Sequence, residues 1–427
     1  MDVERFFRED LPKIQALLKS NSDAAGRQPL SLSLGSVDLS DLLNYSACER
    51  VFFFSSKDKN FSFLGLGLAI SLTKKEVTGF YQQYPKCFLT TELTFEQTPS
   101  EGTYHLHEWN FVCKDNQCTL VMFKNGETRS YSPPTLLLDP NTPVEEEDFI
   151  PPWASYEENP EHDEWTRMIE KADELFNNGE LQKIVLSRRK IFGYNEILDP
   201  FAFFRQLKRK NQKNKSFTIF HQPRFGEAFL SITPEKLFSL EERNFESISL
   251  AGSAARGKTE KEDQELEEFL RTDDKLVREH SLVTEELCEK LGPLSEKLDI
   301  SPLITMKLPY IQHRQADIKA TLKQNISALE LIELLHPTPA IGGLPWNKAR
   351  HCLKEIEPFD RGVYAAPIGI LSAHYSELAV GIRSAFIQPD KITIFGGAGI
   401  VKGSVAEEEW IETGTKMNPF LKVVHNE

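Results

Sequence analysis

The irregular order of predicted strands and helices beyond about residue 160 is the feature that most restricts how this chain can fold. Apolar runs at 181–192 and 391–397 are typical of strands, whereas 161–179 and 262–292 have the apolar spacing of helices. Strands and helices do not alternate regularly, as repeated βαβ units would require. We therefore predict an α+β fold and not a doubly wound parallel sheet.

The N-terminal part of the chain has the pattern of a strand-rich region. Between residues 28 and 140, short apolar runs alternate with turn residues, which predicts a succession of short strands. The stretch 140–160 is rich in Pro and Glu and is expected to be a linker or a surface crossing. This stretch need not separate two domains.

The charge balance argues against a nucleic-acid partner. The 427 residues include 50 Lys and Arg against 64 Asp and Glu, which gives a formal net charge of −14. A partner with a phosphate backbone requires a basic surface, so nucleic acid is disfavoured. An anionic small molecule remains compatible with this composition if its site is locally positive.

The apolar pattern and the cysteines bear on the location of the protein. No apolar run approaches the roughly 20 residues of a membrane span, and the charged start lacks the apolar core of a signal peptide. We therefore expect a cytoplasmic protein with no membrane partner, either a monomer or a weak homodimer. The six cysteines are scattered and include no C-x-x-C pair, which favours reduced thiols over a disulfide framework.

Three glutamates are candidates for holding a hard cation. Glu409 and Glu412 share one face of a predicted C-terminal helix, where acids also compensate the helix dipole. Glu279 lies at the edge of the apolar stripe of the predicted 262–292 helix, where a carboxylate needs a partner. That partner is either an arginine, such as Arg271 or Arg278, or Mg²⁺, which prefers carboxylate oxygens. The residues alone leave both alternatives open.

A lysine and a further glutamate are candidates for acid–base chemistry. Lys183 lies on a predicted strand, on the face opposite Ile184 and Leu186. A lysine shielded from water can act as a general base, although an edge-strand lysine that blocks aggregation is commoner. Glu235 follows a strand directly after Pro234, where a turn would present its carboxyl group to a cleft. The alternative for Glu235 is an acid at the start of a helix.

Further candidates would bind an anion. Arg383 lies within an apolar predicted strand, where a guanidinium is costly unless it meets a partner such as a carboxylate. Gly396, Gly397 and Gly399 follow a strand and would offer backbone N–H groups to an anion. His336 stands at the head of a loop rich in Pro and Gly and is either structural or directed at a substrate.

Eight motifs, taken in order, resemble the chorismate-utilising enzymes. They are KIVLSRR, TPEKLF, SLAGSAARG, REHSLV, HPTPAIGGLPWNKA, EPFDRGVYAAPIG, AVGIRSA and FGGAGIV with the following KGSVAEEEWIETGTK. That family includes isochorismate synthases, salicylate synthases, anthranilate synthase component I and aminodeoxychorismate synthase. The resemblance covers 160–427, the region expected to carry the active site. It implies two packed, mainly antiparallel β-sheets flanked by helices, with 1–150 as a divergent part of the same fold.

The resemblance implies a site for chorismate, a dianion held between Mg²⁺ and Arg383. The implied metal ligands are Glu279 and Glu412, with Glu409 acting directly or through water. Arg383 and the backbone of Gly397 match positions that grip the enolpyruvyl carboxylate. The other implied substrate contacts are Tyr364, Gly252, Ser253 and His336.

The resemblance also implies the reaction. Lys183 matches the general base of the members that add water, and Glu235 matches the acid that protonates the departing C4 hydroxyl. Water then attacks C2 while hydroxide leaves C4, which makes isochorismate for menaquinone or catechol siderophore synthesis. Anthranilate synthases carry glutamine in place of Lys183, and aminodeoxychorismate synthases carry a nucleophilic lysine in place of Ala251. No glutaminase subunit is therefore expected.

Two alternatives share the same residues. A salicylate synthase would use the same lysine and glutamate and would then release pyruvate. The 340–346 loop resembles isochorismate synthases more closely, while 280–282 and 363–365 depart from the commonest versions of both. A non-catalytic chorismate-binding protein would need a broken acid, base or metal ligand, and all of these residues are present.

Overall fold

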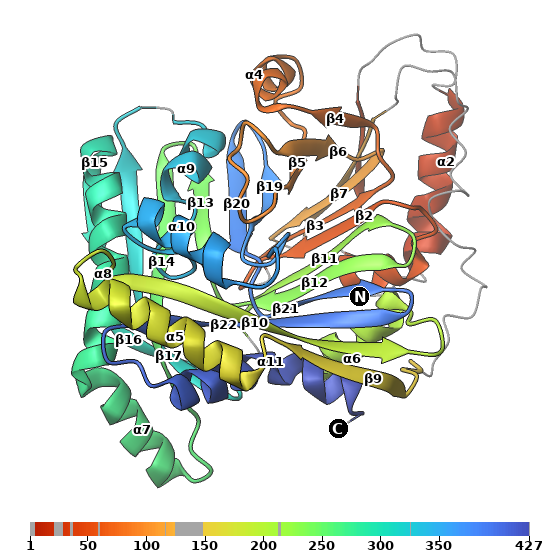
Figure 1. Cartoon of the computed structure of the whole chain (residues 1–427). Coiled ribbons are helices and arrows are strands. Elements are labelled where there is room, and N and C mark those ends of the chain that lie inside the picture. Colours follow the sequence, from red (N-terminus) through yellow and green to blue (C-terminus); the bar gives the residue numbers. More distant parts are fainter. Residues whose placement is uncertain are drawn as a thin grey trace.

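The strands of this protein form two large sheets that pack against each other. The computed structural model describes residues 5–20, 29–34, 37–58, 60–115, 117–123, 148–211, 215–324 and 326–426. Within these ranges every strand pair is antiparallel. Helices flank both sheets (Figure 1). The predicted α+β class and the pair of mainly antiparallel sheets are confirmed.

The first sheet has twelve strands in the described part of the chain. Their bounds are β1 (Leu30–Leu34), β2 (Val51–Ser55), β3 (Phe61–Leu66), β7 (Trp109–Lys114), β8 (Gln117–Met122), β9 (Trp153–Asn159), β10 (Lys183–Tyr194), β11 (Phe217–Arg224), β12 (Glu227–Thr233), β18 (Gly343–Leu344), β21 (Ser384–Gln388) and β22 (Lys391–Val401). Their order is β1, β8, β7, β3, β2, β11, β12, β21, β22, β10 and β18, and β9 also pairs with β10.

The second sheet has ten strands in the same ranges. Their bounds are β4 (Ile70–Leu72), β5 (Leu89–Glu92), β6 (Thr103–Leu106), β13 (Lys236–Glu241), β14 (Asn244–Ala255), β15 (Ser295–Ile300), β16 (Ile304–Lys307), β17 (Ile311–Leu322), β19 (Pro367–Leu371) and β20 (Tyr375–Val380). Their order is β15, β17, β14, β13, β20, β19, β5, β6 and β4, and β16 also pairs with β17.

Strands from the two halves of the sequence pair within both sheets. In the first sheet β2 pairs with β11, and in the second β5 pairs with β19. The predicted linker at 140–160 is only partly testable, because residues 140–147 lie outside the described ranges. Its end is not a linker, since β9 forms there and pairs with β10. The strand resembles a loop in sequence because nearly all of its side chains are exposed.

The helices lie around the sheets. Their bounds are η1 (Phe6–Asp10), α2 (Leu11–Ser20), α3 (Leu39–Leu42), η2 (Leu43–Tyr45), α4 (Lys74–Gln83), α5 (His162–Asn177), α6 (Pro200–Lys210), α7 (Glu260–Thr272), α8 (Asp274–Leu291), η4 (Gly292–Leu294), α9 (Ala328–Leu335), α10 (Trp346–Ile356) and α11 (Ala406–Val424). Helices α5 and α11 pack on β22, whereas α8 contacts both β14 and β22 (Figure 1). None of the described helices is long and apolar enough to cross a membrane.

The single helix predicted over 262–292 is wrong, because the chain breaks into α7 and α8. Asp273 has an extended backbone, and its side chain accepts a hydrogen bond from the backbone N–H of Leu276 at 3.0 Å. An aspartate in this position caps the start of a new helix and ends the previous one. Arg314 from β17 donates to the carbonyls of Leu270 and Arg271, which closes the end of α7.

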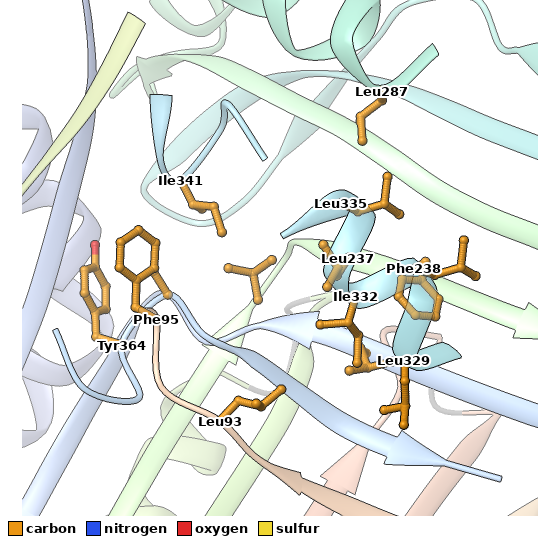
Figure 2. Close-up of a cluster of buried hydrophobic side chains, with 14 of the residues drawn as sticks. Leu93, Phe95, Leu237, Phe238, Leu287, Leu329, Ile332, Leu335, Ile341 and Tyr364 are labelled. Carbon is orange, nitrogen blue, oxygen red and sulfur yellow. The ribbon is translucent and has the colours of Figure 1, made fainter. Parts of the chain in front are cut away.

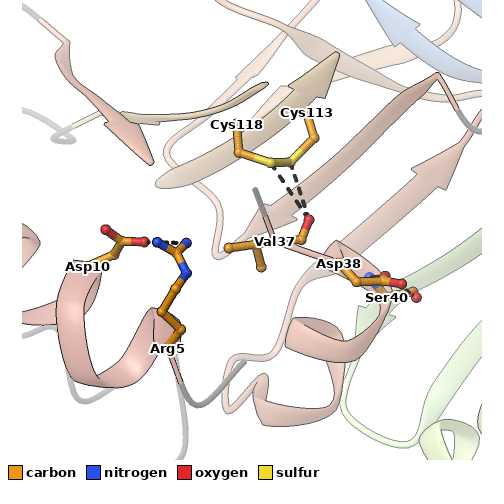
Figure 3. Close-up of a disulfide and its surroundings, with 7 residues drawn as sticks. All are labelled: Arg5, Asp10, Val37, Asp38, Ser40, Cys113 and Cys118. Atoms are coloured by element: carbon orange, nitrogen blue, oxygen red, sulfur yellow. Dashed lines mark hydrogen bonds and ion pairs between the residues drawn. A yellow bond between two sulfur atoms is a disulfide. The ribbon is translucent and has the colours of Figure 1, made fainter. Parts of the chain in front are cut away.

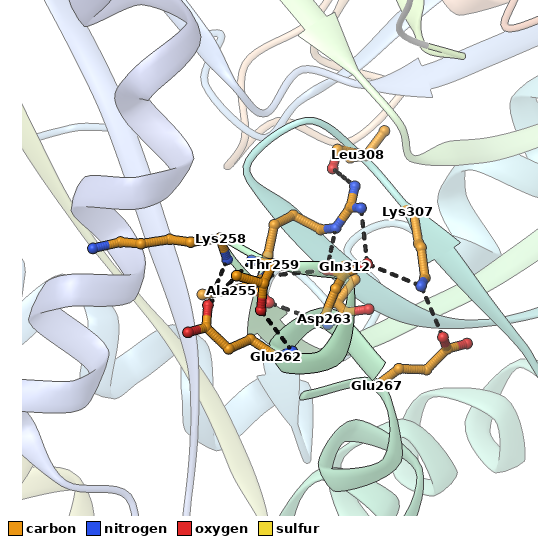
Figure 4. Close-up of polar contacts among 11 residues, drawn as sticks. Ala255, Lys258, Thr259, Glu262, Asp263, Glu267, Lys307, Leu308 and Gln312 are labelled. Carbon is orange, nitrogen blue, oxygen red and sulfur yellow. Dashed lines mark hydrogen bonds and ion pairs between the residues drawn. The ribbon is translucent and has the colours of Figure 1, made fainter. Parts of the chain in front are cut away.

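Helix α7 is attached to the second sheet mainly by polar contacts (Figure 4). Asp263 accepts hydrogen bonds from Arg256 at 2.6 and 2.9 Å and from Lys307 at 3.0 Å. Lys307 also pairs with Glu267 at 2.8 Å. The helix itself buries only Asp263 and Leu270. Ion pairs, more than apolar burial, therefore fix α7 and the corner that leads into α8.

The expectation of reduced thiols is wrong for one pair of cysteines. Cys113 on β7 and Cys118 on β8 are opposed in the hairpin register and form a disulfide (Figure 3). A spacing of five residues brings two side chains together only when the chain turns tightly between them, which the cysteine spacing alone did not reveal. The other four, Cys48, Cys87, Cys288 and Cys352, are free.

The two sheets meet through a layer of apolar side chains. One cluster joins Phe52, Phe54, Phe61, Phe63, Phe217, Ile219 and Phe229 of the first sheet to Ile368, Ile370 and Ala379 of the second. A larger cluster lies under α8, α9 and α10 and extends from Phe238 through Ile332 and Leu335 to Ile341 and Tyr364 (Figure 2). The last two of these residues also face the pocket described below.

Replacing Phe238 with alanine tests this core. The ring is fully buried and stacks on Phe245 with centroids 5.8 Å apart. Phe238→Ala should lower the free energy of unfolding by about 3–5 kcal/mol, because it removes apolar burial and leaves a cavity. Chemical denaturation measures this loss. Phe269, which is 51% exposed, is the control, and Phe269→Ala should change stability by no more than about 0.5 kcal/mol. Equal effects would contradict the assigned core.

Candidate functional site

A pocket lies where the chain crosses twice between the two sheets. Strand β12 leads through Glu235 into β13, and β20 leads through Arg383 back into β21. Because β12 pairs with β21 and β13 with β20, the two crossings lie side by side. The backbone N–H of Val380 donates to the carbonyl of Glu235 at 3.0 Å, and that of Ile232 to the carbonyl of Arg383 at 3.1 Å. The sheet topology therefore brings Glu235 and Arg383 to one place.

The pocket includes about 680 Å³ of empty space, part of it open to solvent. The predicted site residues that line it are Glu235, Gly252, Ser253, Glu279, Tyr364, Arg383, Gly396, Gly397 and Gly399. Lys183 does not line the pocket itself, but its ammonium group donates a hydrogen bond to Glu279, which does. The lining also includes His313, Arg361 and Lys416, which the sequence did not single out.

Lys183 and Glu279 form a buried ion pair. The Nζ of Lys183 donates to Oε1 of Glu279 at 2.9 Å, and the two side chains are 0% and 12% exposed. Lys183 is not an edge-strand lysine, because β10 is paired here with both β18 and β22. The partner of Glu279 is thus a lysine from β10 and neither Arg271 nor Arg278. Burial opposes its ionisation, but the charge of Lys183 prevails and lowers the pKa of Glu279.

A glycine makes room for this pair. Gly399 lies on β22 opposite Val185, and a Cβ atom there would overlap Oε1 of Glu279 and approach Cε of Lys183 to 3.0 Å. Any larger residue would have to displace the ion pair. Gly396, Gly397 and Gly399 do not follow a strand, as predicted, because they lie inside β22. Their small size, more than turn geometry, accounts for their place.

Glu409 and Glu412 also have lysine partners. Oε1 of Glu409 lies 2.6 Å from Nζ of Lys275 on α8, and Oε1 of Glu412 lies 2.6 Å from Nζ of Lys416. Glu409 is buried, although an acid that only compensates the helix dipole could remain in solvent. Burial and the neighbouring charge of Glu412 raise the pKa of Glu409 to about 7, against the opposing effect of Lys275.

The three glutamates have the donor chemistry that suits Mg²⁺. Glu279, Glu409 and Glu412 all offer carboxylate oxygens, the ligands that this hard cation prefers. In the structure each carboxylate instead meets a lysine ammonium. Among the described residues no three acidic, histidine or cysteine groups are arranged to hold a metal ion. Binding a metal here therefore requires at least one of the lysines Lys183, Lys275 and Lys416 to move.

Arg383 has the properties of an anion-binding residue. It lies between two strands, not inside one as predicted, and its φ of 46° is unusual for a residue other than glycine. Its Nη2 donates to Nε2 of His313, whose Nδ1 therefore carries the proton and donates to Oγ of Ser253 at 2.9 Å. Burial lowers the pKa of Arg383 to about 10, and its Nε has no hydrogen-bond partner. A carboxylate would satisfy both the charge and the free donor.

Glu235 has the properties of a proton donor. It lies in the turn between β12 and β13 and does not start a helix. Burial raises the pKa of Glu235 to about 7, although the charges of Lys183, Lys416 and Arg383 oppose this shift. At neutral pH a substantial fraction of this carboxyl group is therefore protonated, as a general acid requires.

The backbone also shapes the pocket at Gly252. The residue interrupts the register between β14 and β17, so it lies in a bulge with a φ of 76°. A Cβ atom there would lie 3.2 Å from the carbonyl of Leu276 on α8. Glycine therefore permits both the strained backbone and the close approach of α8, and it places Ala251 and Ser253 on the pocket wall.

His336 does not line the pocket. Its Nε2 donates to the carbonyl of Phe95 at 3.2 Å, and the two rings meet edge to face with centroids 5.7 Å apart. Burial lowers the pKa of His336 to about 4, so the ring is neutral. These contacts favour a structural role for His336 over a contact with the substrate. His313 is the histidine at the pocket, and only the pairing of β14 with β17 brings it there.

Arg361 and Glu357 form a second buried ion pair beside the pocket. Two guanidinium nitrogens of Arg361 contact the two oxygens of Glu357 at 2.8 and 2.6 Å. Arg361 also donates to the carbonyls of Val185 and Ile341, at 2.6 and 2.9 Å. Glu357 accepts the backbone N–H of Ser187 at 2.8 Å. The pair joins β10 to the loop that forms the pocket wall.

Replacing Lys183 tests the buried ion pair without any assay of activity. Lys183→Met should lower the free energy of unfolding by roughly 3–5 kcal/mol, because it leaves the Glu279 carboxylate buried without its partner. The double variant Lys183→Met/Glu279→Gln removes that charge and should recover most of the loss. Chemical denaturation of the single and double variants measures both effects. Equal stability of the two variants would contradict the pair.

Comparisons with known proteins find one matching family and several related enzymes. A family model described as chorismate binding enzyme matches residues 88–425. Isochorismate synthase MenF of Haemophilus influenzae is 34% identical over 263 residues, which are 62% of this chain and 61% of that protein. Isochorismate synthase EntC of Escherichia coli K12 is 34% identical over 269 residues, which are 62% of this chain and 68% of that protein. The matched region thus spans less than two thirds of the Haemophilus protein.

Solved structures extend the similarity to nearly the whole chain. The menaquinone-specific isochorismate synthase MenF of Escherichia coli superposes with a TM-score of 0.85 at 25% identity, covering 96% of this chain and 98% of that one. Anthranilate synthase component I of Streptococcus pneumoniae superposes with a TM-score of 0.62 at 20% identity, covering 88% and 91%. The second match shows a shared fold alone.

Proposed function

The chain belongs to the family of chorismate-binding enzymes, and on that premise we propose that it converts chorismate to isochorismate. One observation carries the proposal: a protonatable buried glutamate and a buried arginine line one pocket, and a buried lysine is hydrogen-bonded to Glu279 in its wall. The similarity to isochorismate synthases supports the same reaction. Its product would serve menaquinone or catechol siderophore synthesis.

Chorismate carries two carboxylates, and two positive groups would hold them. Arg383, with its free Nε, binds the enolpyruvyl carboxylate, assisted by the backbone of Gly397 and by Tyr364. Glu279 and Glu412 would hold a Mg²⁺ ion for the ring carboxylate, and Glu409 would act as a ligand directly or through water. When bound, the ion would supply Lewis-acid polarisation and orientation of that carboxylate. The lining near Gly252 and Ser253 surrounds the ring.

Lys183 and Glu235 carry the proton transfers. Lys183 acts as the general base and takes a proton from water as the water oxygen bonds to C2. The ring double bonds shift, the C4–O bond breaks, and Glu235 donates its proton to the leaving oxygen, so water departs. A positioned base and acid each contribute about 10²–10⁴-fold to such a rate. Glu279 keeps Lys183 in place through the 2.9 Å hydrogen bond.

Two other activities of the family are less well supported. A salicylate synthase would use the same base and acid and would then eliminate pyruvate. The named relatives at about a third identity are isochorismate synthases, which favours a reaction that stops at isochorismate. An amine-forming enzyme would need a different residue at Lys183 or a lysine at Ala251, whose methyl group lines the pocket.

Product analysis tests the proposed function. Purified protein is incubated with chorismate and Mg²⁺, the products are separated by chromatography, and pyruvate is assayed in parallel. We expect isochorismate without pyruvate, and no product from Lys183→Ala. Salicylate with an equal amount of pyruvate would instead identify the protein as a salicylate synthase. The absence of any product under these conditions would refute the proposal.

The pH dependence of kcat/KM tests the role of Glu235. The proposed acid is active when protonated, and its pKa in the folded protein is raised to about 7. The contribution of this acid should therefore fall as pH rises through about 7, by about tenfold per unit at the limit of a one-proton loss. Glu235→Gln should remove most of the activity. A rate that stays constant through and above neutral pH would contradict this assignment.

A further inference from the structure

The carboxylates proposed to hold Mg²⁺ are already neutralised by lysines. Lys183 pairs with Glu279, Lys275 pairs with Glu409, and Lys416 pairs with Glu412, at distances between 2.6 and 2.9 Å. A divalent cation that binds among these three pairs meets three ammonium groups as well as three carboxylates. Because like charges repel strongly where water is scarce, at least one ammonium group must withdraw for the ion to bind tightly.

Lys275 is the lysine that the structure leaves free to withdraw. Lys183 is 0% exposed and is enclosed between strands, and Lys416 is held by the carbonyl of Gly397 at 2.9 Å as well as by Glu412. Lys275 has one described hydrogen bond, to Glu409, and its side chain is 25% exposed. It lies in the first turn of α8, next to solvent, so its four-carbon stem can turn outward.

Lys275 also lies where its charge acts on the whole group of carboxylates. It precedes Glu279 by one helical turn on α8, so the two side chains share a face. Its ammonium group pairs directly with Glu409 of α11 at 2.6 Å. Lys275 therefore lies between the helix that carries Glu279 and the helix that carries Glu409 and Glu412.

We propose that Lys275 is a displaceable counter-ion that neutralises these glutamates in the metal-free protein and competes with Mg²⁺ for Glu409. The lysine keeps Glu409 and Glu412 together while no metal is bound, and it leaves Glu409 when the metal arrives. It thereby weakens metal affinity and stabilises the metal-free fold. This inference rests on the proposed magnesium site and adds a residue that is neither ligand, base nor acid.

The test measures metal binding in the absence of chorismate. Wild-type protein, Lys275→Met and Lys275→Arg are titrated with Mg²⁺ in a calorimeter, and each is melted with and without the ion. Lys275→Met should bind Mg²⁺ about tenfold more tightly, because a competing charge is lost. It should also melt at a lower temperature than wild type without metal and gain more from added Mg²⁺. Lys275→Arg keeps the charge and should stay within about threefold of wild type.

Lys290→Met is the matched control. Lys290 lies on the same helix and pairs with Glu286 at 2.6 Å, so the variant loses one lysine from one ion pair near the other end of α8. Its Mg²⁺ affinity should equal that of wild type. Lys275→Gln replaces Lys275→Met if the latter does not fold, with the same expected increase in affinity.

The outcomes separate this inference from the proposed function. Unchanged or weaker Mg²⁺ binding by the folded neutral variants would overturn the counter-ion role, even if wild type binds the metal and forms isochorismate. Binding by Lys275→Met alone would support it strongly. Absence of binding by every protein would overturn it together with the magnesium ligands, while the product assay would still decide whether the protein acts on chorismate.

Discussion

The pairing of β12 with β21 and of β13 with β20 is the constraint on which the site depends. It forces the chain to leave one sheet and enter the other twice at the same point, in opposite directions. Backbone groups at such a crossing do not follow a regular ladder, which is why Arg383 adopts a positive φ and Glu235 lies in a turn. Side chains from both sheets can face one pocket there, and neither sheet alone could supply them.

Electrostatics then decides what the pocket can do. An isolated buried charge is expensive, so most of the buried ionic groups here have a partner of opposite sign. Glu235 lacks a direct partner and holds its proton more tightly, while Arg383 keeps a donor free. Groups with incomplete partners are the ones left to interact with a substrate. Glu279, Glu409 and Glu412 each pair with a lysine, so at least one of these lysines must withdraw before the three carboxylates can hold a cation.

Much of this arrangement could be predicted from the sequence, but not its geometry. The strand and helix patterns predicted the α+β class, and most of the site residues that the resemblance of the motifs predicted line the pocket. Residues whose place depends on contacts distant in sequence were missed: His313 is brought in by strand pairing, and Lys275 by the approach of α8 to α11. The break at Asp273 was missed because the apolar stripe continues across it, and His336 was placed at the substrate although its ring packs on Phe95.

The Arg361–Glu357 pair has a consequence for the edge of the first sheet. Strand β18 covers the start of β10 and β9 covers its end, so the segment between them has no neighbouring strand on that side within the described part of the chain. There Arg361 donates a hydrogen bond to the carbonyl of Val185, and Glu357 accepts one from the N–H of Ser187. The carbonyl of Gly342, in a loop, accepts a hydrogen bond from the N–H of Val185. An unpaired strand edge is a template on which another chain can add. Two side chains and a loop thus close the gap beside the candidate catalytic lysine, and this closure keeps the molecule from joining its neighbours edge to edge.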